Sequence, residues 1–300
     1  MRRCAYRVRR RGGSFAHDLA IFDAQVIAGD TGFGNGVHSG LVAYYIMRYG
    51  TEEQKQRWLP KMASGELITA IAMTEPRGGS DLNNLRTVAR REGDEYVVNG
   101  SKMFTSNGGS ADLVLLVLKT ATVDGPISLL AVESDRQGYT VGRILNKVGM
   151  KAQDTAQLFF DDVRVPTGNL IGQEGMGLLY ATERLAHERL LIAAASATVM
   201  ECAVAETVKY AKTREAYGKP ISRMQHIRFE IARCATTARV GRVFVDKCIG
   251  DHLASTLDAA TACMAKVWLT EQQCEVVDRC VQIFGGYGYM LDYPRIGHLN

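Results

Sequence analysis

The stretch Ile71-Ala72-Met73-Thr74-Glu75-Pro76-Arg77-Gly78-Gly79-Ser80-Asp81 decides how the rest of the chain is interpreted. An apolar segment runs into a proline and two glycines, which end a strand and leave backbone N–H groups and small hydroxyls facing outward. Such a turn can cradle a cofactor, but Thr-Glu-Pro followed by glycines is also common in ordinary turns. The stretch alone leaves both interpretations open.

The composition fits a globular chain with a core of its own. The 300 residues are 46% hydrophobic and 23% charged, with a formal net charge of +4, and a chain of this length can form two or three packed units. The seven cysteines form no Cys-x-x-Cys pair, which favours a reducing compartment. No apolar run approaches the length of a membrane span, and no signal peptide is recognised.

Arginine is concentrated at the start of the chain. Six arginines between Arg2 and Arg11 precede the first acidic residue, Asp18. Such a segment can be a mitochondrial transit peptide or sequence foreign to the fold, and we favour the second interpretation. Elsewhere the positive charge is spread out, so nucleic-acid binding by this start is the least favoured function.

The residues that precede the opening stretch are predicted to be helical. Within Ser39–Tyr49 apolar residues recur at helical spacing, and Gly50 ends the pattern. Thr51 and Gln54 form a capping box for a second helix, which Gly65 ends.

The hydrophobic period then changes to that of β-strands. Short runs rich in aliphatic and β-branched residues are separated by turn signals, of which Asn99-Gly100 is typical of a two-residue hairpin. The predicted strands are Leu67–Met73, Glu95–Val98, Lys102–Thr105, Leu113–Lys119, Ile127–Glu133, Tyr139–Leu145 and Gln157–Val165. Residues 67–166 are therefore predicted to form a β-domain, either a small barrel or a sandwich.

After this β-domain the period returns to helical. We predict helices at about Gly177–Thr213, Ser222–Cys248 and Leu257–Phe284, whose length and short connections indicate an antiparallel bundle. The predicted fold class is therefore α+β. It has a partial N-terminal helical domain at residues 1–66, the β-domain at 67–166 and a C-terminal helical bundle at 167–300.

Three further stretches have the composition of a ligand site. Met103-Phe104-Thr105-Ser106-Asn107 places an aromatic ring beside hydroxyl groups, which suits a flat ring system. Arg214, Tyr217-Gly218-Lys219-Pro220 and Gln225 place a cation near a break between two helices, where a phosphate could bind. Gln282-Ile283-Phe284-Gly285-Gly286-Tyr287-Gly288-Tyr289-Met290 ends a helix in glycines, so backbone can approach a ligand closely. Each stretch taken alone is more common as a turn or a helix cap.

Together, the order and spacing of the four stretches resemble the acyl-CoA dehydrogenase family. The resemblance runs from about Ser39 to Pro294 and includes Lys147-Val148-Gly149-Met150-Lys151 and Val165-Pro166-Thr167-Gly168-Asn169-Leu170-Ile171-Gly172. Members of this family have a helical domain, a β-domain and a helical bundle, with FAD held between the last two. The resemblance therefore implies FAD as the cofactor.

The resemblance also implies a role for individual residues. It implies that Met73, Thr74, Gly79 and Ser80 contact the flavin, with Ser80 also near the substrate, and that Phe104, Thr105 and Ser106 lie against the flavin ring. The positions that match residues reaching the FAD of a neighbouring subunit are Arg214, Gln225, Gln282, Ile283, Phe284, Gly285 and Gly286. Sites shared in this way imply a homo-oligomer, and the family is typically a tetramer built as a dimer of dimers.

The reaction implied by the resemblance needs a general base. A carboxylate must take the proton next to the thioester carbonyl, and burial against the acyl chain would raise its pKa towards the working pH. Glu188, in His187-Glu188-Arg189-Leu190-Leu191-Ile192, looks like the base of the long-chain and isovaleryl branches, with Arg189 beside it at the substrate. The alternative is an exposed helix acid paired with Arg184 or Arg189. A zinc helix would need a histidine in place of Leu191, so no metal is expected.

Both ends depart from the family pattern. Residues 1–34 match it poorly, and neither Met1–Arg11 nor Arg295–Asn300 resembles the segments expected there. The chain is therefore expected to be a fragment or a product altered at both ends. No complete first domain follows the Arg-rich start, which weighs against a transit peptide. Arg77 also replaces a residue that is usually small.

The predicted function is that of an acyl-CoA dehydrogenase, which converts a fatty acyl-CoA to a trans-2-enoyl-CoA and passes electrons to an electron-transfer flavoprotein. The expected compartment is a bacterial cytoplasm or the mitochondrial matrix. Two alternatives stay open. One is a related flavin oxidase that uses oxygen, and the other is a non-catalytic family member that keeps the bundle without a complete pocket.

Overall fold

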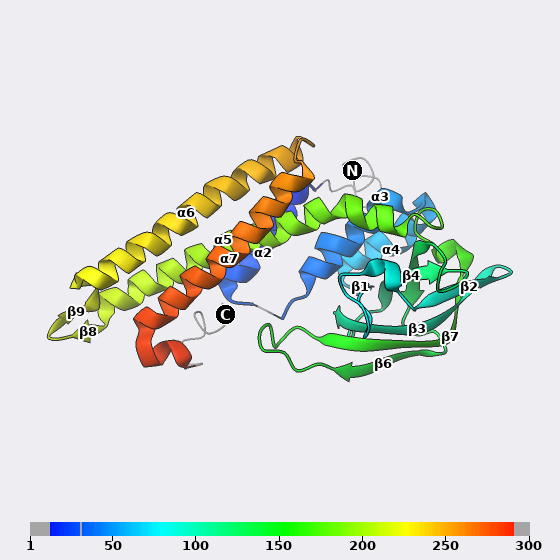
Figure 1. Cartoon of the computed structure of the whole chain (residues 1–300), viewed down its shortest axis with the longest axis horizontal. Coiled ribbons are helices and arrows are strands. Elements are labelled where there is room, and N and C mark those ends of the chain that lie inside the picture. Colours follow the sequence, from blue (N-terminus) through cyan, green and yellow to red (C-terminus); the bar gives the residue numbers. More distant parts are fainter. Residues whose placement is uncertain (1–12, 31, 291–300) are drawn as a thin grey trace. The chain divides into compact units, whose positions relative to one another are not determined.

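The computed structural model describes residues 13–30 and 32–290, which form two compact units (Figure 1). Among the described residues, the first unit contains residues 13–14 and 32–184, and the second contains residues 15–30 together with 185–290. The Arg-rich segment Met1–Arg11 and the segment Arg295–Asn300, on which expectations about the two ends rest, lie outside the described residues.

The first unit begins with helices. A π-helix, η1 (Gly36–Val42), continues into α3 (Ala43–Tyr49), so the predicted helix spans both. The capping box before α4 (Glu52–Ser64) is confirmed, since the Thr51 side chain accepts from the Gln54 N–H and the Gln54 side chain from the Thr51 N–H. Gly65 ends α4 with a φ of 79°, a conformation that favours glycine.

The β-domain of the first unit is one curled sheet of seven strands. Of the two architectures predicted, a small barrel and a sandwich, the sheet resembles the barrel. The strands are β1 (Thr69–Ala72), β2 (Val88–Glu92), β3 (Glu95–Ser106), β4 (Leu113–Thr120), β5 (Ile127–Glu133), β6 (Tyr139–Ile144) and β7 (Thr155–Pro166). Their order is β1-β4-β2-β3-β7-β6, and β5 pairs with the other edge of β4. Along its length β4 pairs parallel first with β1 and then with β2.

The predicted hairpin at Asn99-Gly100 is wrong, because β3 runs through both residues and joins two runs predicted as separate strands. Its pairing with β7 shifts register between Val98 and Gly100, as at a β-bulge. Gly100 has a φ of 145°, and a Cβ there would lie 2.6 Å from Cα of Thr87. The hairpin connects β2 to β3 at Gly93 instead. The sequence prediction lacks β2 because three charged residues follow Ala89.

The strand β4 lies at the centre of this unit and is buried on both faces. Its even-numbered side chains, such as Leu116, pack with residues of β3, β5 and β7, whereas odd-numbered ones, such as Leu115, pack with Ile46 and Trp58 of the helices. Successive strand side chains point to opposite faces, so a strand covered on both sides needs a continuous apolar run. This explains why the apolar run Leu113–Lys119 predicts a strand.

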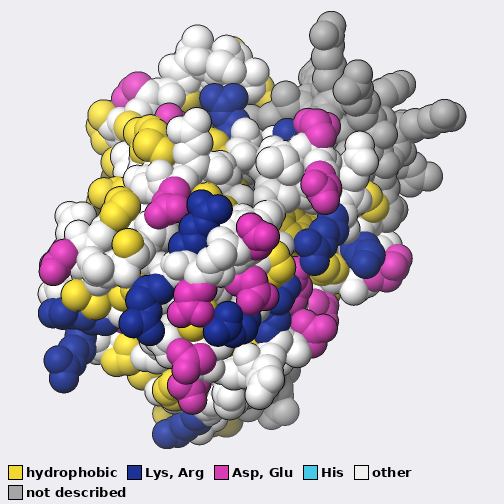
Figure 2. Space-filling model, turned by 90° about the vertical axis from the view of Figure 1, so that its right-hand side faces the viewer, with side chains coloured by type: hydrophobic (Ala, Val, Ile, Leu, Met, Phe, Trp, Pro, Cys, Tyr) yellow, Lys and Arg dark blue, Asp and Glu magenta, His cyan; other side chains and the backbone are white. Residues whose placement is uncertain are grey.

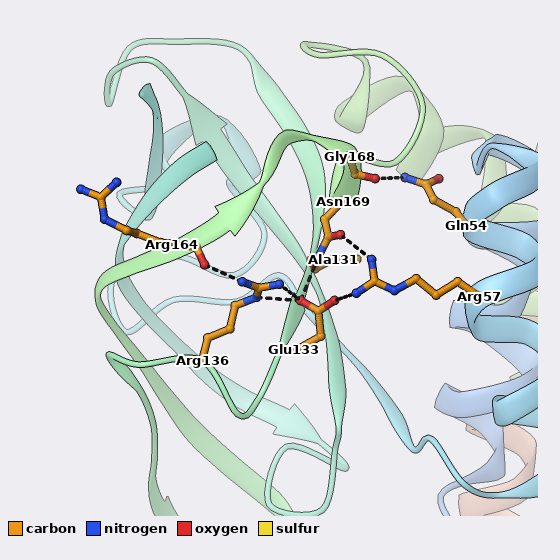
Figure 3. A network of polar contacts seen from close by, with 8 residues as sticks. All are labelled: Gln54, Arg57, Ala131, Glu133, Arg136, Arg164, Gly168 and Asn169. Carbon is orange, nitrogen blue, oxygen red and sulfur yellow. Dashed lines mark hydrogen bonds and ion pairs between the residues drawn. The ribbon is translucent and has the colours of Figure 1, made fainter. Parts of the chain in front are cut away.

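Hydrogen bonds and an ion pair between polar side chains hold α4 against the sheet (Figure 3). Arg57 donates to Oε1 of Glu133 at 2.7 Å, and Gln54 donates to the backbone carbonyls on both sides of Asn169 at 2.8 Å each. Oε2 of Glu133 accepts from Arg136 and from Asn169. Because one partly buried carboxylate is shared by several donors, this network holds the helix more firmly than an isolated surface ion pair.

The second unit is helical, as predicted for the C-terminal third of the chain. It contains α2 (Phe15–Ala28), the part of α5 (Gly177–Thr213) from residue 185, α6 (Gln225–Leu253) and α7 (Ala259–Phe284). A short hairpin of β8 (Glu215–Ala216) and β9 (Lys219–Pro220) connects α5 to α6. α5 has the predicted bounds, and Figure 1 shows it lying along α6 and α7. α7 begins later than predicted, where Asp258 accepts from the Thr261 N–H.

The helix α2 precedes every predicted helix and packs within this second unit. Phe15 lies against the rings of His187 and His252, with centroid distances of 4.7 and 4.6 Å. Farther along, the Thr198 hydroxyl of α5 donates to the Asp23 carboxylate of α2 and accepts from Arg242 of α6. These contacts join α2 to two helices that are distant from it in sequence.

Two surface properties bear on the expected partners. By length and composition alone α5 could cross a membrane, contrary to expectation, but half of its most apolar window is buried, so this is weak evidence. On the face shown in Figure 2, Lys and Arg side chains are interspersed with Asp and Glu. This face therefore lacks the single-sign field typical of nucleic-acid binding.

We predict that Gly100→Ala lowers the free energy of unfolding by about 2–4 kcal/mol, because the new Cβ meets backbone at a φ that L-residues avoid. Gly168→Ala is the matched control, since nothing lies within 4 Å of a Cβ there, and it should change stability by less than about 0.5 kcal/mol. Denaturant unfolding checks both variants. Equal effects of the two substitutions would contradict this account of the bulge.

Candidate cofactor and active site

The loop after β1 is a tight turn. Glu75 and Gly78 exchange backbone hydrogen bonds of 2.9 and 3.1 Å around Pro76 and Arg77, which are exposed. The predicted flavin contacts Met73 and Thr74 precede the turn and are half-buried, whereas Gly79 and Ser80 follow it and are exposed. The turn therefore presents a run of backbone and hydroxyl groups, as the sequence predicts.

A buried ion pair holds this loop against β3. Nζ of Lys102 lies 2.9 Å from Oε1 of Glu75, and the two side chains are 0% and 5% exposed. The same ammonium donates to the Met73 carbonyl at 3.0 Å. Glu75 also accepts from the backbone N–H groups of Arg86 and Thr87 at 2.6 and 3.0 Å. The carboxylate is thus surrounded by donors, which a buried charge requires.

Burial and pairing act in opposite directions on these two groups. Burial by itself would raise the pKa of Glu75, but the Lys102 ammonium and the surrounding hydrogen bonds outweigh it, so this pKa lies below its ordinary value. Burial lowers the pKa of Lys102 to about 8, although Glu75 favours the charged amine. The pair is therefore ionised at neutral pH, with the lysine closer to losing its charge.

The second predicted flavin segment is a bulge in β3. The pairing with β7 shifts register between Lys102 and Thr105, and Phe104 has a φ of 58°. Phe104 is 62% exposed as a residue, whereas Oγ1 of Thr105 is buried and has no hydrogen-bond partner among the described residues. A left-handed backbone at a residue other than glycine raises the free energy of the folded chain. Such strain beside an exposed aromatic side chain favours a ligand site at this bulge.

A cavity of about 390 Å³ opens beside this bulge. It is lined by Phe104 and Ser106 of β3 and by Leu145, Asn146, Lys147, Gly149, Met150, Gln153 and Thr155. The segment that contains Lys147 carries part of the family resemblance, but the sequence predicts no site role for it. Lys147 donates to Oγ1 of Thr155 at 2.9 Å, so the lysine shapes the cavity wall. Its position next to Phe104 could not be read from local sequence, because about forty residues separate them.

Most of the candidate FAD contacts of the second unit gather around one cavity of about 500 Å³. Of the predicted residues, Arg214, Ile283, Phe284, Gly285 and Gly286 line it, together with Tyr210, Ile221, Tyr287 and Met290. Gln225 and Gln282 are exposed and do not line it. A cation among apolar side chains and glycine backbone suits a group that combines a phosphate with a flat ring.

The walls of this cavity are held by aromatic contacts. The rings of Tyr210 and Phe284 stack at 4.1 Å, and the Tyr210 hydroxyl donates to the Phe284 carbonyl at 3.3 Å. The Arg214 guanidinium lies 5.6 Å from the centre of the Tyr287 ring, within the range of a cation–π contact. Gly285, with a φ of 59° and a ψ of −136°, ends α7 in a conformation that suits glycine.

The candidate base Glu188 lies on α5 among buried residues. It is half-buried itself, and its neighbours His187, Leu190 and Leu191 are buried. Arg189, predicted to lie at the substrate, donates to Sγ of Cys263 at 3.1 Å. Within the described residues, no group of three or more His, Cys, Asp or Glu side chains could hold a metal ion.

Family descriptions match the chain in three consecutive segments. "Acyl-CoA dehydrogenase, N-terminal domain" matches residues 11–66, the middle domain residues 70–163 and the C-terminal domain residues 175–300. The match extends farther at each end than the motifs that carried the resemblance.

Relatives of known identity agree with this match. The chain is 43% identical over 288 residues to the long-chain specific acyl-CoA dehydrogenase of Mus musculus mitochondria, covering 94% of this chain and 67% of that protein. An acyl-CoA dehydrogenase structure from Geobacillus kaustophilus is 47% identical with a TM-score of 0.92, over 96% of this chain and 76% of the other. A glutaryl-CoA dehydrogenase from Mycobacterium smegmatis in complex with FADH2 is 29% identical with a TM-score of 0.86, over 93% and 72%.

The fold is that of a flavin-dependent oxidoreductase. The chain belongs to the acyl-CoA dehydrogenase family.

We predict that Lys102→Met lowers the free energy of unfolding by about 3–5 kcal/mol at pH 7, because Glu75 is left buried without its counter-charge. The double variant Glu75→Gln, Lys102→Met should be more stable than Lys102→Met because it buries no charge, even though the single amide oxygen can replace only one of the two carboxylate oxygens that accept from the backbone N–H groups of Arg86 and Thr87. Denaturant unfolding of both single variants and the double variant measures the coupling. Additive effects of the two substitutions would contradict the ion pair as the cause.

Proposed function

We propose that this chain catalyses the FAD-dependent α,β-dehydrogenation of a fatty acyl-CoA thioester to the trans-2-enoyl-CoA. The observation that carries the proposal is the gathering of Arg214, Ile283, Phe284, Gly285 and Gly286 around one cavity, although some seventy residues separate the first from the others. Residues chosen from a family resemblance alone have no reason to share a cavity unless they bind the same ligand.

The residues of the first unit fit a flavin in three respects. The loop of Met73, Thr74, Gly79 and Ser80 offers backbone and hydroxyl groups. Phe104 holds an exposed ring beside a cavity, and the buried hydroxyl of Thr105 is still unsatisfied among the described residues. We infer that these segments contact the flavin, with Ser80 also reaching the substrate.

The cavity of the second unit fits the phosphate and adenine parts of FAD. The Arg214 guanidinium supplies a fixed positive charge, and the glycines after Phe284 let the backbone come close. The exposed Gln225 and Gln282 would add hydrogen-bonding groups at its rim. We propose that this cavity serves FAD bound by a neighbouring subunit, so the chain acts as a homo-oligomer.

Glu188 is the proposed base. Its carboxylate would take the α-proton of the thioester, and the apolar residues beside it would keep water from stabilising the charged form, which raises the basicity of the carboxylate. When bound, FAD would accept the hydride that leaves the β-carbon. Arg189 would orient the substrate next to the base.

The relatives bear on the acyl chain and the compartment. A mouse relative is specific for long chains, so a long-chain fatty acyl-CoA is the substrate to test first. Relatives come from mitochondria and from bacteria, which fits either the mitochondrial matrix or a bacterial cytoplasm. We propose an electron-transfer flavoprotein as the electron acceptor; an oxygen-using flavin oxidase is the alternative, and oxygen consumption during turnover separates the two.

We predict that Glu188→Gln retains FAD but is reduced by a long-chain acyl-CoA about 10²- to 10⁴-fold more slowly, which is the usual contribution of a positioned base. Anaerobic stopped-flow absorbance of the flavin band measures this rate. Glu183→Gln is the control, because it lies on the same helix, is exposed and can still accept from the Tyr49 hydroxyl. Reduction of Glu188→Gln at the rate of the unmodified chain would rule out this base.

We predict that Arg214→Gln weakens FAD binding about 10- to 100-fold, since a hydrogen bond to a charged group contributes about 1.5–3 kcal/mol. Arg223→Gln tests for a general loss of positive charge, because Arg223 is exposed, lies on the same connection and does not line the cavity. Fluorescence titration with FAD compares the two variants. If both bind FAD like the unmodified chain, the cavity is not an FAD site.

A further inference from the structure

The side chain of Lys102 connects the two segments that the proposed function assigns to the flavin. It donates to the carbonyl of Met73 and to the carboxylate of Glu75, which stand on either side of Thr74. The next residue, Met103, donates its N–H to the Thr74 carbonyl at 2.9 Å. Three consecutive loop residues are therefore tied to two consecutive residues of β3.

The same lysine stands where the bulge in β3 begins. Lys102 is the last residue paired with β7 before the register shifts, and Phe104 follows two residues later with its left-handed backbone. A non-glycine residue in that conformation is strained and persists only where the surroundings hold it. The buried anchor at Lys102 is one such restraint.

We propose that Lys102 is a positioning residue for the flavin, and that its positive charge holds the Met73–Thr74 segment and the Phe104 bulge in the geometry that binds the cofactor. The inference rests on the proposed function, because it concerns the affinity for FAD. It assigns a role to a side chain that is fully buried and itself touches neither cavity.

The charges that act on Lys102 are few. Glu75, from the loop after β1, is the one charged group that influences it within the described part of the chain. Arg86 and Thr87 donate backbone N–H groups to the same carboxylate, and β7 places Leu158 opposite Lys102. Loss of the lysine proton therefore changes a neutral pair into a single negative charge. It also weakens the bond to Met73, since a charge-assisted hydrogen bond is about twice as strong as a neutral one.

Lys102 loses its proton at a pH that lies within the range of a binding experiment. The pKa of Lys102 lies at about 8, below the ordinary value of 10.5. The folded chain therefore binds fewer protons than the unfolded chain between these values, and this group makes folding more favourable as the pH rises through them. Weaker FAD binding caused by this deprotonation would consequently not come from unfolding. A purely structural role would change stability and FAD affinity in the same direction.

The test is the dissociation constant for FAD, measured by fluorescence between pH 6.5 and 9.0, with thermal unfolding recorded in the same buffers. The unmodified chain should bind FAD about tenfold more weakly at the alkaline end, with a midpoint near pH 8. Lys102→Arg, which keeps its charge throughout, should bind without that step. Lys119→Arg, at a second buried lysine in the sheet, should retain the step.

Glu75→Gln provides a second measurement. Without its counter-charge Lys102 loses its proton at lower pH, so the midpoint should move below that of the unmodified chain, whether or not Lys102→Arg folds. A flat profile in the unmodified chain, the same step in Lys102→Arg, or an unmoved midpoint in Glu75→Gln would overturn the inference. A chain that takes up no FAD at pH 7 would instead overturn the proposed function, and this inference with it.

Discussion

The buried ion pair between Lys102 and Glu75 is the constraint on which the site in the first unit depends. A lysine with no exposed side-chain surface is tolerated because a carboxylate and a carbonyl meet its ammonium group. The carboxylate in turn comes from the turn that ends β1, so satisfying one charge fixes the path of the loop. Strand β4 is buried on both faces at the centre of the unit, whereas the ion pair holds the loop after β1 against β3.

Much of the fold follows from hydrophobic periodicity, and the exceptions have local causes. The apolar run of β4 and the long pattern of α5 are strong signals, because burial on both faces or along one stripe demands them. Asn99-Gly100 misled the prediction, since the glycine is there to let β3 pass close to Thr87 and not to turn the chain. In β2 the error runs the other way, because the charged residues after Ala89 interrupt the apolar pattern and a real strand is not predicted.

The candidate site shows a similar division. Local composition marks the turn, the aromatic segment and the glycines after Phe284, and the resemblance supplies their roles. Neither source reveals that Lys102 links two of these segments, nor that Lys147 shapes the cavity beside Phe104, because both facts depend on pairing between distant strands. The resemblance selects residues that line the cavity around Arg214, whereas the ion pair under the loop becomes visible only in the packing of the folded chain.

The visible absorption spectrum of the purified chain, loaded with FAD and then mixed anaerobically with a long-chain fatty acyl-CoA, tests the central claim most directly. The account predicts a bound flavin band that bleaches when the acyl-CoA is added, because the chain both holds the cofactor and removes the α-proton. A chain that binds no FAD, or one whose flavin band is unchanged by fatty acyl-CoA, would contradict it.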